Sequence, residues 1–408
     1  MTKYELTERG KGIVVFIIAV IVLTSSTIVA VGAWDGSPAR APPYEAVSVA
    51  SQNFEPIVTN NFAGEVWTTA GTGTHGAEDG YPAQFNLPRG IFGGDDGTLY
   101  IADTFNNLIR NIDTEQYVRR VTGDVLVHDE TNFPHGFYMD TELDAALFNR
   151  PTDVLVDTYG RLVMADSENN SIRIVVGQRV YTFAGSAEAG HADGSSREAR
   201  FNRPTAISLC PSGYIYVADT LNHAIRRIDP DGNVTTVAGT PGIHGSRDGA
   251  ANSAQLNRPS GIAVSQTGRI YIADTGNHLI RVIENGVLQT LAGTLRFTSG
   301  IAWEVPTDID DVPLGGLQDG FDAMFNTPMG LELWNGNLIV ADSMNHVIRA
   351  ILPTGETITI AGAAYPGYTN APAGRAAFHM PAGLYVRENT LYIADTGNNT
   401  IRAMELVG

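Results

Sequence analysis

Short apolar runs separated by turn residues fill the chain from residue 64 to its last residues. One stretch shows the plan in four runs, at residues 206–209, 214–218, 224–228 and 234–238, each rich in Val, Ile, Ala or Tyr. Pro-Ser-Gly separates the first two runs, and Pro-Asp-Gly separates the last two. Runs of this length and composition predict strands joined by tight turns. Because the runs are apolar on both faces, we expect each sheet to pack between others. This stretch therefore predicts four short antiparallel strands.

The same plan recurs six times with unchanged offsets. In each copy Ala-Asp is followed by Ser or Thr, and Asn, Ile and Arg lie three, six and seven residues after the Asp. A unit of this kind cannot bury its apolar faces alone, so the repetition predicts an array of neighbouring units. The repeated acidic and basic residues are Asp103 and Arg110, Asp166 and Arg173, Asp219 and Arg226, Asp274 and Arg281, Asp342 and Arg349, and Asp395 and Arg402.

The number of strands favours a closed ring. The last copy ends with its third strand near Gly408, and an unassigned strand-like run, residues 66–72, precedes the first copy. We expect this N-terminal strand to complete the last unit, which removes exposed strand edges. The predicted fold is all-β: a six-bladed β-propeller of four-stranded antiparallel blades, preceded by one apolar helix. A solenoid is the alternative, but it needs end caps that the sequence does not suggest.

The repeated motif resembles that of a known family. Ile-Ala-Asp-Thr-x-Asn-His-x-Ile-Arg, preceded by Phe-Asn-x-Pro, is similar to the NHL repeat, and the resemblance covers residues 64–408. It implies a six-bladed propeller. Its implication for function is broad, because NHL propellers occur in lyases, receptor-kinase sensors, RNA-binding proteins and adhesion proteins.

The N-terminal part has a different composition. Residues 13–33 are uncharged and mostly apolar, which is long enough for a helix that crosses a bilayer, and Lys3, Arg9 and Lys11 precede them. Positive charge stays on the cytoplasmic side, so residues 1–12 should be cytoplasmic and the propeller should lie outside. A cleaved signal peptide, and hence secretion, is the alternative. Residues 34–63 are rich in Pro, Ala and Ser and predict a linker.

The charge balance restricts the partners. The chain has 26 basic and 44 acidic residues and a net charge of −18. Nucleic-acid binding depends on basic groups that displace counterions, so we expect no nucleic-acid partner and contact with the membrane only through the N-terminal helix. Basic proteins or cations are favoured.

The repeated polar residues bracket one turn in each copy. Six identical sets around a ring cannot form one active site, so we interpret the Asp and Arg residues as structural pairs within or between blades. Removal of one member of a buried pair costs on the order of 3 kcal/mol.

Further polar residues should gather on the face that carries these turns. Loop residues His75, His191 and His244 could bind a transition metal such as zinc, and Asp residues with backbone carbonyls could bind calcium in the channel. Arg150, Arg203 and Arg258 begin the first strands of their copies, which places them near the channel mouth. His223, His278 and His346 occupy a turn position where other copies have Asn, so we interpret them as turn residues.

Two longer segments, residues 121–147 and 295–324, interrupt the period. Long loops on a rigid scaffold often carry binding residues. Aromatic residues beside carboxylates suit protein or sugar recognition, and the carboxylates could also bind a cation. The candidates in the second segment are Trp303, Asp308, Asp310 and Asp311.

The sequence favours an extracytoplasmic scaffold that binds a protein or other ligand through its polar face. The alternative is a metal-dependent lyase or lactonase-like enzyme with its site at the channel mouth. No Gly-x-Ser-x-Gly or His-Glu-x-x-His motif is present, and we expect the channel to be lined mainly by Gly, Ile, Val and Ala. A sensor domain is a third possibility, but only about twelve residues precede the apolar run.

Overall fold

The computed structural model describes residues 63–124, 136–295 and 314–407. The apolar run at residues 13–33, the linker up to residue 62 and the candidates Trp303, Asp308, Asp310 and Asp311 lie outside the described residues. Within the described part, no helix has the length and apolar composition needed to span a bilayer.

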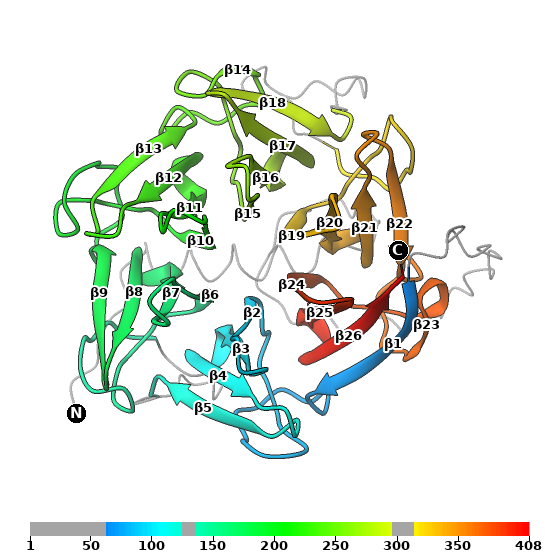
Figure 1. Cartoon of the computed structure of the whole chain (residues 1–408), viewed down its shortest axis with the longest axis horizontal. Coiled ribbons are helices and arrows are strands. Elements are labelled where there is room, and N and C mark those ends of the chain that lie inside the picture. The colour runs from blue at the N-terminus through cyan, green and yellow to red at the C-terminus, as the bar shows by residue number, and fades with distance from the viewer. Residues whose placement is uncertain (1–62, 125–135, 296–313, 408) are drawn as a thin grey trace, which may run out of the picture. The chain divides into compact units, whose positions relative to one another are not determined.

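Six antiparallel sheets surround a common axis, as Figure 1 shows. Each sheet is one blade, and its first strand lies next to the axis. The predicted six-bladed propeller is therefore confirmed, and in the third copy the four strands lie within a residue or two of their expected positions.

The strands are given from the axis outward. Blade 1 consists of β2 (Ile91–Gly93), β3 (Leu99–Asp103), β4 (Leu108–Ile112) and β5 (Val118–Thr122). Blade 2 consists of β6 (Pro151–Val156), β7 (Leu162–Asp166), β8 (Ser171–Val176) and β9 (Arg179–Gly185), and blade 3 of β10 (Pro204–Leu209), β11 (Ile215–Asp219), β12 (Ala224–Ile228) and β13 (Val234–Ala238). Blade 4 consists of β15 (Gly261–Val264), β16 (Ile270–Asp274), β17 (Leu279–Glu284), β18 (Val287–Ala292) and β14 (Gly249–Ala250). Blade 5 consists of β19 (Pro328–Trp334), β20 (Asn337–Asp342), β21 (Val347–Ile351) and β22 (Thr357–Ala361). Blade 6 consists of β24 (Pro381–Arg387), β25 (Thr390–Asp395), β26 (Thr400–Leu406), β1 (Ala63–Ala70) and β23 (Ala371–Pro372).

A short 3-10 turn joins the second and third strands of every blade. The residue after each turn adopts the left-handed conformation, with φ between 50° and 59°, and it is Asn in three blades and His in the other three. Such a conformation is unfavourable for most side chains, whereas Asn and His adopt it more readily. The turns are η1 (Thr104–Asn106), η2 (Ser167–Asn169), η3 (Thr220–Asn222), η4 (Thr275–Asn277), η5 (Ser343–Asn345) and η7 (Thr396–Asn398); a seventh, η6 (Ala373–Arg375), lies in a connection between blades.

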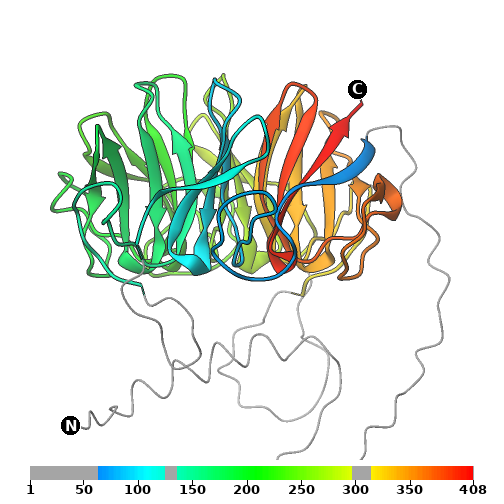
Figure 2. The same ribbon diagram turned by 90° about the horizontal axis from the view of Figure 1, so that it is seen from below.

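These turns and the connections between blades lie on the same side of the ring, which we call the turn face. Asn106 Nδ2, at the end of η1, donates to the carbonyl of Gly76 in the connection from β1 to β2, and the other five blades repeat this contact. In Figure 2 the connection from β1 to β2 runs along the lower side of the ring.

The first and last described strands are neighbours in blade 6. β1 pairs with β26 in antiparallel register, with Val66 opposite Met404 and Thr68 opposite Arg402. Val66 is buried with Met404 and Leu406 in the core that blades 5 and 6 share. The two ends of the described chain are thus held in one sheet (Figure 1).

The apolar core lies between the blades. Six apolar clusters are arranged around the ring, and each contains residues of two adjacent sheets. Val163 and Ile172 of blade 2, for example, pack with Val217 and Ile228 of blade 3. Both faces of every sheet are therefore covered, which explains why its strands are apolar without strict alternation.

Substitution of Val66 by Asp tests the contribution of β1 to the ring. Val66→Asp places a charge in the core between blades 5 and 6, so we expect a loss of about 3 kcal/mol in the free energy of unfolding. Glu65→Asp puts the same side chain on the exposed face of β1 and should change stability by less than about 0.5 kcal/mol. Urea denaturation measures the free energy of unfolding of both variants. If Val66→Asp were as stable as Glu65→Asp, β1 would not contribute to the stability of the ring.

Candidate functional site

The repeated polar residues form one buried network in each blade. In blade 3, Asp219 Oδ2 accepts from Arg226 Nη1 and from Asn222 Nδ2 at 2.8 Å each, and Oδ1 accepts from the backbone N–H of Asn202. Both charged side chains have no exposed surface. Arg226 also lies 5.2 Å from the centre of the Phe201 ring and donates to Asp193 on the incoming connection. The other five blades repeat the Asp and Arg pair at 2.6–2.9 Å.

Burial raises the pKa of each repeated Asp, to about 6 in blades 1 to 5. Burial raises the pKa of Asp219 to about 6, because the loss of hydration outweighs the attraction of Arg226. The charge is therefore compensated inside the blade, where no ligand can reach it. The sequence left open whether the Arg pairs within its own blade or with the next, and the structure places both partners in the same blade.

A second set of hydrogen bonds links neighbouring blades near the channel. The left-handed residue after each turn accepts from the backbone N–H of the residue that precedes the first Pro of the next blade, at 2.7–3.1 Å. Asn uses Oδ1 and His uses Nδ1, so both residue types provide the same acceptor. The six acceptors are Asn107, Asn170, His223, His278, His346 and Asn399.

The loop histidines do not meet. His191 Nε2 lies 3.0 Å from Thr236 Oγ1, and the ring of His244 lies 5.6 Å from that of His223. His75 belongs to the connection into blade 1 and the other two to those into blades 3 and 4. The described part of the chain contains no group of three or more His, Cys, Asp or Glu residues that could hold a metal ion.

Arginine residues gather at the mouth of the channel on the turn face. Arg203 pairs with Glu168 at 3.1 Å, and Arg150 lies 4.0 Å from the same carboxylate. Arg89 lines the channel close to them; burial, then Arg203 and Arg150, lower its pKa to about 10. Arg258 occupies the equivalent position in blade 4, where its backbone N–H donates to His223. One carboxylate thus faces three guanidinium groups in a strongly acidic protein.

The channel itself is a cavity of about 460 Å³ lined by the first strands of all six blades. Adjacent first strands approach closely: a Cβ atom on Gly261, Gly330 or Gly383 would lie 1.8–2.0 Å from a carbonyl oxygen of the next blade. Glycine is required there, and this contact limits the width of the channel.

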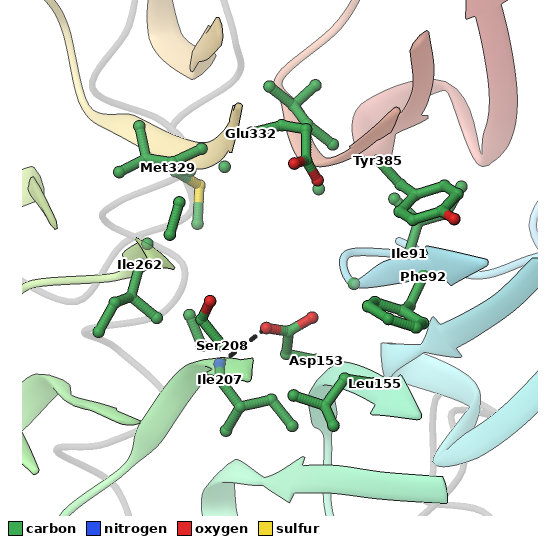
Figure 3. Close-up of a pocket in the computed structure, with 18 of the residues that line it drawn as sticks. Ile91, Phe92, Asp153, Leu155, Ile207, Ser208, Ile262, Met329, Glu332 and Tyr385 are labelled. Atoms are coloured by element: carbon green, nitrogen blue, oxygen red, sulfur yellow. Dashed lines mark hydrogen bonds between the residues drawn. The ribbon is translucent and has the colours of Figure 1, made fainter. Parts of the chain in front are cut away.

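Asp153 of blade 2 occupies the position at which blades 1, 4, 5 and 6 have Gly. Its Oδ2 accepts from the backbone N–H of Ile207 in blade 3 at 2.8 Å, and its Oδ1 from that of Val154. Glu332 extends from blade 5 and accepts from Leu333 N–H at 2.9 Å. Figure 3 shows both carboxylates pointing into the channel, from opposite walls.

These two carboxylates lack compensation by a basic side chain. Burial raises the pKa of Asp153 to about 7, and burial together with the charge of Asp153 raises that of Glu332 to about 7. Among the described residues, no Lys, Arg or His forms an ion pair with either group. Gly, Ile, Val and Ala provide 12 of the 28 lining residues, so the expected lining is confirmed in part, but the expectation missed Asp153 and Glu332. Comparison of the six copies would have found Asp153, because it departs from the repeated Gly.

Aromatic residues form one wall of the channel. The rings of Phe92 and Tyr385 lie 5.3 Å apart between centroids, and the Tyr385 hydroxyl donates to the carbonyl of Gly93. Ile262 and Met329 also line the cavity (Figure 3). The channel can therefore contact both a charged group and an apolar one.

The histidine acceptors between blades should make stability depend on pH. Burial, with the charge of His244 next, lowers the pKa of His223 to about 4, and burial with His379 lowers that of His346 to about 4. An unfolded His has a pKa of about 6.5, so the unfolded chain binds protons first, and stability should fall as the pH decreases from about 6.5 to 4.

The double variant His223→Asn, His346→Asn keeps both acceptors without titrating groups. We expect it to lose less stability than the wild type between about pH 7 and pH 4.5 in urea denaturation, whereas His75→Asn, outside this ring of contacts, should behave like the wild type. An unchanged pH dependence in the double variant would argue against this role.

Comparisons with known proteins agree with the repeat. Models of the NHL repeat and of the teneurin NHL domain match residues 256–283 and 69–243. NHL repeat-containing protein 2 of Homo sapiens is 30% identical over 340 residues, which cover 63% of this chain and 46% of that protein. Protein SUPPRESSOR OF QUENCHING 1 of Arabidopsis thaliana is 36% identical over 132 residues, 30% of this chain and 12% of that protein. The chain thus spans half or less of the length of these relatives.

Solved structures share the fold at low identity. An auxiliary nutrient binding protein from Bacteroides ovatus superposes with a TM-score of 0.60 at 18% identity, covering 85% of this chain and 78% of that one. A putative gluconolactonase gives a TM-score of 0.51 at 12% identity, covering 86% and 94%. These likenesses concern the fold alone. With six copies of the motif, a six-bladed ring and matches to two NHL models, the chain contains NHL repeats that form a six-bladed β-propeller.

Proposed function

We propose that this protein is a binding propeller that takes a ligand through its turn face, with the central channel as the pocket. The observation that carries the proposal is the presence of two uncompensated carboxylates, Asp153 and Glu332, inside a cavity of about 460 Å³. Ligand pockets commonly have volumes of about 300 to 1,000 Å³ and a few convergent polar groups. Both carboxylates are half-buried in the channel. A poorly hydrated charge without a basic partner destabilises the free protein, and a ligand that supplies the partner reduces this cost.

The lining of the channel favours binding over catalysis. None of the residues that line it is His, Cys or Lys, and the Ser208 hydroxyl accepts from the backbone N–H of Val264 rather than contacting a base. The usual pairing of a nucleophile with a base is thus missing among the lining residues. The raised pKa of Asp153 favours the second candidate, a lyase or lactonase-like enzyme, because a group that titrates near neutrality can act as a general acid or base.

We also propose that the propeller is displayed outside the cytoplasm on a membrane-spanning helix at residues 13–33. The support is the uncharged run of 21 residues and the basic residues before it. We expect the full chain to remain in the membrane fraction after alkaline extraction, and protease added outside intact cells or spheroplasts to degrade the propeller. Protection from the protease would contradict this orientation, and release of a shortened chain would favour a cleaved signal peptide.

Ligand binding in the channel can be tested by thermal-shift measurements of the full chain against a chemically varied set of small metabolites. We expect at least one compound to raise the melting temperature, because binding to the folded state stabilises it. The shift should disappear in Ser208→Phe, which places a bulky ring in the channel, and persist in Glu405→Gln on the exposed side of β26.

The melting temperature of Ser208→Phe without ligand shows whether this variant folds. Recovery of an unchanged compound after incubation would support binding, whereas its conversion would support the enzyme. Shifts that persist in folded Ser208→Phe, or a complete absence of shifts, would contradict the channel as the binding site.

A further inference from the structure

The acidic side chains that are buried or line the channel fall into two groups in the described part of the chain. Seven Asp side chains are buried in the described part of the chain, and an Arg lies within 2.9 Å of every one of them: Asp103, Asp157, Asp166, Asp219, Asp274, Asp342 and Asp395. Asp153 and Glu332 are enclosed by the channel and depart from this rule. Their only described hydrogen-bond partners are backbone N–H groups, which stabilise the charge without neutralising it.

The missing partner is a cation, and the positions of the two carboxylates on their strands show which part of the channel it would occupy. Asp153 corresponds in the repeat to Gly330, so Glu332 lies two residues further along its own strand, or about 7 Å along the channel. The two blades face each other across the channel, and the carboxylates approach its centre from opposite sides (Figure 3).

A bare metal ion fits this arrangement poorly. Calcium takes six to eight oxygen ligands at about 2.3–2.6 Å, and zinc takes about four ligands at about 2.0–2.3 Å. The described residues of the channel provide two carboxylates on opposite walls and no cluster of three metal-binding side chains.

An organic ammonium ion matches the lining better. Its N–H groups need only one carboxylate within hydrogen-bond distance, and its carbon skeleton needs apolar contacts. Phe92 and Tyr385 provide aromatic surface near the carboxylates, which attracts a cation through the ring faces. Ile262 and Met329 provide aliphatic surface.

We propose that the channel binds a small primary amine in its protonated form, with the ammonium group in the part of the channel that Asp153 and Glu332 face and the apolar part against Phe92 and Tyr385. This proposal rests on the proposed function and names its ligand class. The cation has the role that the repeated Arg has beside the buried carboxylates within the blades.

The proposal implies a link between binding and protons. The ammonium ion binds the ionised carboxylates, whose pKa values lie near 7 in the free protein, so binding releases protons at neutral pH. Affinity should therefore fall as the pH decreases through 7, although the amine remains protonated throughout.

Isothermal titration of the full chain with benzylamine and with benzyl alcohol, its neutral counterpart of the same shape, tests the ligand class. At about pH 8 we expect saturable binding of benzylamine, with an affinity at least about ten-fold higher than that of benzyl alcohol. Asp153→Asn and Glu332→Gln should each weaken benzylamine binding by about ten-fold or more, and so should a decrease to about pH 5.5. Glu405→Gln removes one negative charge outside the channel and should leave the affinity unchanged.

Equal binding of benzyl alcohol, unchanged binding in folded Asp153→Asn and Glu332→Gln, or no binding of benzylamine would overturn the proposal. Thermal melting of each variant establishes that it is folded. If benzylamine fails while another metabolite gives a shift that Ser208→Phe abolishes, the binding function stands and the amine class is wrong. If no compound binds in the channel, both proposals fail.

Discussion

A carboxylate that is removed from water needs a compensating charge, and this constraint shapes every blade. The Asp at the end of the second strand and the Arg in the third strand are fully buried and lie within 2.9 Å of each other. The Asn at the end of the turn donates to the same carboxylate, and the Arg reaches the connection into the blade. One network therefore holds two strands, a turn and an incoming connection in a single geometry, which explains why the offsets between these residues never change along the chain.

The ring imposes a second constraint. First strands of neighbouring blades approach so closely that four blades have Gly at the point of contact, and six side-chain acceptors link each turn to the next blade. Nearly every repeated polar residue is occupied by these contacts. What is specific to this protein is therefore found where a copy departs from the repeat. Asp153 in place of Gly and Glu332 on the channel wall are departures of this kind, and they leave negative charge in the central channel without a basic partner.

Much of the fold could be predicted from the sequence, because local patterns specify it. The offsets between Asp103, Asn106 and Arg110 predict a strand, a turn and a strand, and those elements are present. That spacing also predicts a structural role for Asp103 and Arg110, but only the structure shows that they pair within one blade. The site was harder to predict. Which face of a first strand turns toward the channel depends on how blades pack around the axis, so Asp153 looked like any polar residue at a strand start. His75, His191 and His244 recur at similar loop positions, but that recurrence distributes them over three blades instead of bringing them together. Trp303, Asp308, Asp310 and Asp311 remain predictions.

The account rests on the difference between compensated and uncompensated carboxylates, and the stability of three variants tests it directly. The free energy of unfolding at about pH 8, where all three groups are ionised, is measured for Asp219→Asn, Asp153→Asn and Glu332→Gln. We expect Asp219→Asn to lose about 3 kcal/mol, because Arg226 loses its partner inside the blade. Asp153→Asn and Glu332→Gln should be at least as stable as the wild type, because each removes a charge that the free protein leaves unpaired. Channel variants as unstable as Asp219→Asn would contradict the account.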